Sequence, residues 1–191
     1  SSSPLSSKNA TATDLLPMVP VLLASGLVFG VIAMLFMLAL FKSAAVAAKT
    51  GLPPLLLTLV AALICGVVAM FVPEILGSGV NEINTIFDGG YALEFLFLLF
   101  VLKLLATSLC IGFGLFGGVF SPAAMIGAAA GGFIGKFMAS LGFMTVPHLL
   151  PVAGFAAVTA AVVGAPISVV LVVFELTQSY EFAVAAMLAA V

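Results

Sequence analysis

The sequence is short of charge. Only 6% of its 191 residues are charged, whereas 64% are hydrophobic. Soluble domains carry about 25% charged residues, because polar side chains must cover their surface in water. This scarcity excludes a soluble globular domain. It predicts an all-α integral membrane protein that crosses the bilayer several times, since helices satisfy their own backbone hydrogen bonds in lipid.

Other absences exclude further classes of protein. The chain has no Trp and a single histidine, His148, and its net charge of −2 offers no basic surface to a nucleic acid. It also lacks the Gly-x-Ser-x-Gly and His-Glu-x-x-His sequences, so we expect neither an enzyme nor a metal cofactor. The only cysteines, Cys65 and Cys110, lie within apolar runs. We expect them to be buried as small hydrophobic side chains, not to form a disulfide or a metal site.

Long uncharged runs indicate where the chain crosses the membrane. A run of about 20 apolar residues spans a bilayer as a helix. The first three predicted spans are Leu15–Phe41, Leu55–Val72 and Ala92–Leu115. Residues 1–14 are predicted to form a polar loop or tail, and residues 15–191 one transmembrane repeat of about eight helical segments.

Basic residues predict how the chain is oriented. Lys42 and Lys49 are expected in a short loop between the first two spans, and the positive-inside rule places that loop in the cytoplasm. The acids Glu74, Glu82 and Asp88 surround a glycine-rich break. We expect them to be solvated loop residues, with a weak cation site as the alternative.

Glycine and proline interrupt the later apolar runs. Backbone groups freed at such breaks must be buried in protein or line a polar cavity, because lipid cannot satisfy them. Helices broken at membrane depth are typical of transporters. Small residues four apart also favour close helix contacts. The glycine pairs with this spacing are Gly26/Gly30, Gly114/Gly118, Gly127/Gly131 and Gly131/Gly135.

The break at Gly117–Pro122 predicts an anion site. Gly117 and Gly118 are expected to end one helix, with Ser121 or Phe120 as the cap and Pro122 opening the next helix, where a missing amide is harmless. The free amides and the positive dipole end of a helix N-terminus attract anions without a basic side chain. The same spacing also fits a helix break that is simply filled by packing.

The run from Lys103 to Gly135 resembles the CLC family of chloride channels and chloride–proton antiporters, in its core sequence Gly118-Val119-Phe120-Ser121-Pro122. The stretch Ala161–Thr177 resembles the family's Ala-Pro and Phe-Glu-Leu-Thr segment. Gly77-Ser78-Gly79 falls where the family has a glycine-rich break. The resemblance implies a CLC-type bundle of tilted, partly discontinuous helices, of which this chain is the second of two inverted repeats.

The same resemblance implies transmembrane chloride transport. The anion-binding residues that it implies are Gly118, Val119, Phe120, Ser121 and Pro122, with the amides of Val119 and Phe120 as ligands. Chloride is then the substrate, no cofactor is expected, and the partners are the bilayer, a first-repeat half of the same transporter and a second copy in a homodimer. Channel and antiporter both stay open, as does another anion such as fluoride. The alternative is a non-conducting fragment or accessory subunit that needs the first repeat.

The chain departs from the family pattern at two positions, and two of its charged residues lie within apolar runs. Gly164 stands where the family often has Arg, and Phe113 replaces a small polar residue. The resemblance therefore does not determine which side chains line the pathway. Glu175, within an apolar run, is expected to bond backbone amides at a helix end. Lys103 is expected to be structural, paired with Glu94 or Glu74 or extended towards the membrane surface, with an anion relay as the alternative.

Overall fold

The computed structural model describes residues 19–76, 79–115, 117–142, 149–164 and 187. All regular structure within these ranges is helical, as expected for an all-α protein. The tail 1–14, His148, Glu175 and residues 165–177 of the second resembling stretch lie outside the described residues. The helices are α2 (Val19–Thr50), α3 (Pro54–Phe71), the 3-10 helix η3 (Pro73–Ile75), α4 (Val80–Phe87), α5 (Leu93–Gly112), α6 (Phe120–Ser140) and α7 (Leu149–Val163).

Helix α2 is longer than predicted. It runs for 32 residues and includes Lys42 and Lys49, so the prediction that these lysines lie in a loop is wrong. The stretch after Phe41 is rich in alanine, a strong helix former, and a charge ends an apolar run without ending a helix. The helix stops where Gly51 adopts a φ of 64°, just before Pro53 and Pro54.

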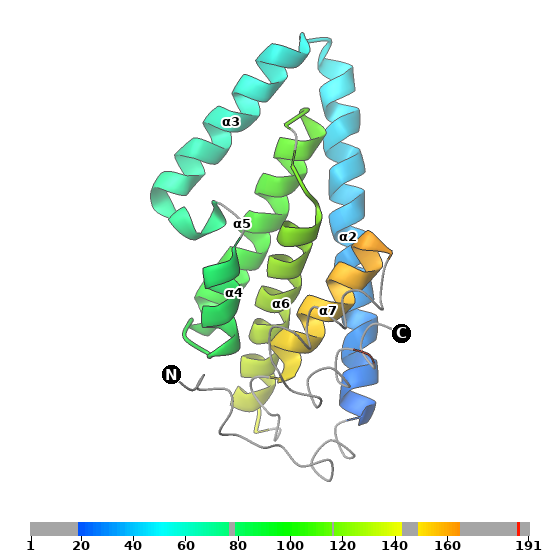
Figure 1. Cartoon of the computed structure of the whole chain (residues 1–191), viewed down its shortest axis with the longest axis vertical. Coiled ribbons are helices and arrows are strands. Elements are labelled where there is room, and N and C mark those ends of the chain that lie inside the picture. Colours follow the sequence, from blue (N-terminus) through cyan, green and yellow to red (C-terminus); the bar gives the residue numbers. More distant parts are fainter. Residues whose placement is uncertain (1–18, 77–78, 116, 143–148, 165–186, 188–191) are drawn as a thin grey trace.

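Four helices are long and apolar enough to cross a membrane: α2 from Leu23, α3, α5 and α6. The expected spans Leu55–Val72 and Ala92–Leu115 correspond to α3 and α5, and α7 is a shorter apolar helix. Figure 1 shows α2 and α3 joined at one end of the molecule, with α3 leaning away from the other helices. The chain is therefore a multi-pass integral membrane protein.

The core lies between α6 and α7. Residues Leu149–Ala160 of α7 are all buried, and so is most of α6 from Ala123 to Gly132. The predicted small-residue contact is confirmed for Gly127 and Gly131. A methyl group on either would lie 2.8 Å from a carbonyl carbon of α7, that of Gly154 or Leu150, and closer still to its oxygen. Gly30 differs, because no atom of the part of the chain that the structure describes lies within 4 Å of the corresponding position.

Candidate functional site at the start of α6

Helix α5 ends before the glycines that were predicted to end it. Its last residue is Gly112, and Gly114 has a φ of 91°. The amide of Gly114 donates to the carbonyl of Ile111 (3.1 Å), and that of Leu115 donates to the carbonyl of Cys110 (2.9 Å). This pair of bonds is a Schellman motif, which satisfies carbonyls at a helix end. Gly117 and Gly118 therefore belong to the connection between α5 and α6.

Helix α6 begins two residues before Pro122. Its N-cap is Val119 and its first residue is Phe120, so the predicted cap at Phe120 or Ser121 is wrong by one or two positions. Pro122 occupies the third helical position, which it can fill because the first amides of a helix have no acceptor within the helix. Figure 1 shows that the α5–α6 connection runs back along α5, so that α6 begins partway along the length of α2.

The start of α6 has the features of an anion-attracting terminus. The first bond of the helix is donated by the Ala123 amide to the Val119 carbonyl (3.1 Å). The N-cap Val119 makes no side-chain cap hydrogen bond with the described residues, and the first turn of α6 contains no acidic residue. A helix of this length carries roughly half a positive charge at its N-terminus, and here no carboxylate in the first turn offsets it.

A cavity of about 440 Å³ lies against this terminus. Gly118, Ser121 and Pro122 line it, whereas Val119 and Phe120 are not among its described lining residues. The Val119 side chain packs against the core, and Phe120 is 41% exposed. The other lining residues are Cys65 of α3, Ile75 and Leu76, Lys103, Ala106, Thr107, Cys110 and Ile111 of α5, and Leu115 and Gly117 of the connection.

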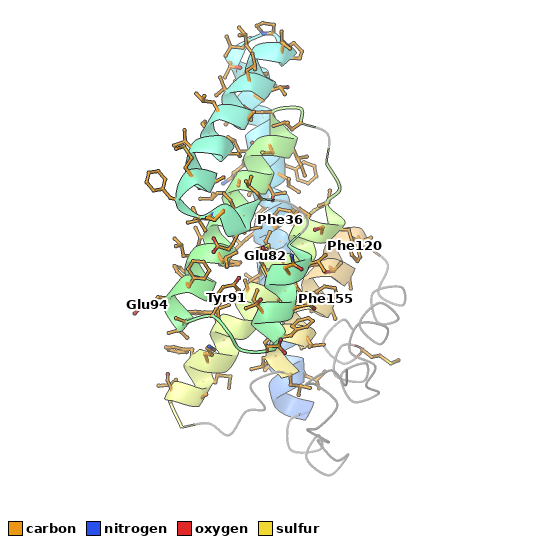
Figure 2. All side chains as sticks on the ribbon, turned by 60° about the vertical axis from the view of Figure 1, so that its left-hand side comes forward. Phe36, Glu82, Tyr91, Glu94, Phe120 and Phe155 are labelled. Atoms are coloured by element: carbon orange, nitrogen blue, oxygen red, sulfur yellow. The ribbon has the colours of Figure 1, made fainter. Side chains whose placement is uncertain are left out.

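Lys103, expected to be structural with an anion relay as the alternative, lies on α5 in the wall of the cavity. Its side chain is 3% exposed, lines the cavity, and donates to the Ile75 carbonyl across 2.7 Å. Figure 2 shows that Glu94, one of its expected partners, projects outwards from the first turn of α5. A buried lysine in the middle of a span is a signal of function, because such a charge is costly in lipid.

The described lining residues of the cavity include no carboxylate, although Glu82 of α4 interacts electrostatically with Lys103 from outside that lining. Glu82 was predicted to lie in a loop but belongs to the first turn of α4. Among the described residues, no group of three or more His, Cys, Asp or Glu side chains could hold a metal ion. The cavity is thus a partly apolar space with an ammonium group, a threonine, a serine and a helix N-terminus in its wall.

The two cysteines contradict the sequence prediction on burial. Cys65 and Cys110 are free thiols of intermediate exposure, and both line the cavity. Their sulfur atoms lie 3.1 Å apart, within hydrogen-bonding distance. This contact could not be predicted from the sequence, because the two residues are on different helices and 45 positions apart.

Known proteins resemble the chain in sequence and in fold. H(+)/Cl(-) exchange transporter ClcA of Vibrio cholerae is 39% identical over 119 residues, which are 61% of this chain and 25% of that protein. A putative chloride channel protein ClcB-like of Ralstonia nicotianae is 36% identical over 146 residues, or 75% of this chain and 34% of that protein. A crystal structure of a slow cyanobacterial Cl-/H+ antiporter superposes with a TM-score of 0.79 at 27% identity, covering 92% of this chain and 42% of that one.

The chain thus spans only about a quarter to a third of the length of these curated relatives. A family model described as voltage gated chloride channel matches residues 2–191, which is nearly the whole chain. This match agrees with the all-helical fold of the described residues and with their four membrane-length apolar helices. The chain belongs to the voltage-gated chloride channel (CLC) family.

Proposed function

We propose that this chain forms part of a chloride transporter and that the anion binds in the cavity at the start of α6. The observation that carries the proposal is the joint position of the α6 N-terminus and Lys103 in one cavity wall, with no carboxylate among the described lining residues. The relatives named as chloride transporters support the choice of anion.

The electrostatics suit an ion that must bind and leave. The helix terminus supplies a partial positive charge and backbone donors, which replace part of the water shell of chloride. Lys103 adds a positive potential, but its ammonium group already donates to the Ile75 carbonyl. An ion in the cavity is therefore attracted without becoming the sole partner of a full charge. Transport needs such moderate binding, because an ion held too tightly does not leave.

We propose the amides of Val119 and Phe120 as ligands, with Gly118, Ser121 and Pro122 shaping the wall. Val119 is the N-cap and Phe120 the first helical residue, so both amides lie where α6 begins. Their side chains need not reach the cavity for this role. In such a site the protein moves an ion without changing a covalent bond, so we propose a transporter and not an enzyme.

Exchange of chloride for protons is the favoured form of transport. One matched relative is named an H(+)/Cl(-) exchange transporter, and the superposed structure is a Cl-/H+ antiporter.

The remainder of the pathway would come from a first-repeat half of the same transporter, in a homodimer. By itself this chain is then expected not to conduct, since one repeat supplies only one wall. Reconstitution of the chain alone and of the complete protein, with chloride and internal pH recorded together, tests both statements.

Replacing Lys103 tests the site directly. Lys103→Met in the complete protein should lower chloride binding by roughly 30-fold. The reason is that an ammonium about 8 Å from the ion contributes about 2 kcal/mol at an effective dielectric constant of about 20. Chloride titration calorimetry in detergent and efflux from liposomes at low chloride measure the effect.

Lys136→Met is the matched control. Lys136 also donates to backbone carbonyls, those of Gly89 and Tyr91, but it does not line the cavity. Both variants lose a lysine bond to a carbonyl and should unfold at a lower temperature, whereas only Lys103→Met should bind chloride more weakly. Equal chloride affinity in the two variants would refute a role of this cavity in anion binding.

A further inference from the structure

The thiols of Cys65 and Cys110 lie side by side, although the two residues belong to different helices. Cys65 belongs to α3 and Cys110 to α5, and their sulfur atoms are 3.1 Å apart. The Cys65 thiol also lies 3.8 Å from the Ala106 carbonyl, one turn before Cys110 on α5. A disulfide has its sulfur atoms about 2.05 Å apart, so an approach of about 1 Å is needed to form one.

Both thiols can be reached by small reagents. They line the cavity of about 440 Å³, and each is of intermediate exposure. A cysteine buried in a packed core is inert, whereas oxidation favours accessible thiols that ionise to the thiolate, and a second thiol nearby allows a disulfide to form. A small, uncharged oxidant of about the size of water would fit beside them.

We propose that Cys65 and Cys110 form an oxidisable dithiol in the cavity wall and that a hydroperoxide converts it to a disulfide joining α3 to α5. One thiol attacks the peroxide oxygen, the O–O bond breaks, and a sulfenic acid and one water form when the oxidant is hydrogen peroxide. The second thiol attacks the sulfenic sulfur, and a second water leaves. The two thiols lose two electrons and two protons, and the peroxide is reduced to two waters.

The disulfide would anchor α3, which is the least buried of the four membrane-length helices. Only 11% of the α3 span is buried, compared with 61% of the α6 span. Figure 1 shows α3 leaning away from the bundle, and within the described part of the chain its main contacts are with α5 and η3. A covalent bond between α3 and α5 would hold two walls of the cavity together. If the proposed function is correct, oxidation therefore slows chloride passage.

The test uses the complete protein in liposomes, treated with hydrogen peroxide. Peptide mapping without reductant should find a peptide containing Cys65 joined to one containing Cys110, lighter by two hydrogens and separated again by dithiothreitol. Cys65→Ser should show oxidation of Cys110 to sulfenic or sulfinic acid without that cross-link. The proposal is overturned if, after treatment of the wild type, each cysteine can still be alkylated. It is also overturned if each is oxidised without being joined to the other.

Chloride efflux distinguishes this proposal from the proposed function. Peroxide should lower efflux at least about twofold in the wild type, because a constriction governs conduction, and dithiothreitol should restore it. Peroxide should leave efflux from the double variant Cys65→Ser/Cys110→Ser at the value that this variant shows before treatment. A cross-link with unchanged efflux refutes control of the cavity by the dithiol. If the untreated wild type moves no chloride, the proposed function fails, and the peptide map alone decides whether the disulfide forms.

Discussion

Gly118→Glu is expected to reduce chloride transport more than about 100-fold. Gly118 lines the cavity, and no atom of the described residues lies within 4 Å of the position a Cβ would take, so a longer side chain can enter without displacing their backbone. Its φ is not positive, so a residue other than glycine is tolerated there. A carboxylate about 5 Å from chloride opposes binding by about 3 kcal/mol at an effective dielectric constant of about 20.

Gly118→Gln is the matched control, since it has the same size without the charge. It should retain much more transport than Gly118→Glu, and the two proteins should unfold at similar temperatures. Chloride efflux from liposomes gives the ratio of the rates. Equal loss in both variants would mean that the side chain blocks space and that the cavity is not selective for negative charge.

Gly131→Ala is expected to prevent stable packing of α6 on α7. The added methyl group would lie 2.8 Å from the Leu150 carbonyl carbon and from the Cα of Pro151, both backbone atoms that a side-chain rotation cannot move. The helices would have to separate, at a cost of about 3 kcal/mol or more. Thermal unfolding in detergent and the yield of monodisperse protein measure this loss.

Gly30→Ala is the comparison for that variant. Gly30 lies in α2 with open space at the Cβ position, so alanine should leave stability unchanged or raise it by up to about 1 kcal/mol through its helix propensity. The same drop in unfolding temperature in both proteins would show that close contact of α6 with α7 is not the reason glycine is needed at 131.

Most of the fold prediction came from the composition and from the glycine and proline residues that interrupt helices. The shortage of charge predicted a membrane protein, and apolar runs located α3 and α5 within a few residues. The break before Pro122 located the start of α6 to within two residues, because glycine and proline act on the backbone nearby. The end of α5 was misplaced because several glycines follow one another, and only Gly114 takes the left-handed conformation that ends the helix.

The cavity was less predictable than the helices. Its wall combines residues from α3, η3, α5 and α6 that are far apart in sequence. A single sequence does not reveal that Lys103 and the start of α6 line one cavity or that the thiols of Cys65 and Cys110 lie together, since both facts depend on how separate helices pack. The binding roles of Gly118–Pro122 stay a prediction that the variants above test.

The glycine contact between α6 and α7 has a consequence for motion. Gly127 and Gly154 each face the backbone carbonyl of the other, so the two helices touch through main-chain atoms and can slide little against one another. Most of the described buried core belongs to this pair, whereas α3 is largely unpacked. We expect the start of α6 to keep its position during a transport cycle. Any displacement should involve the helices around it.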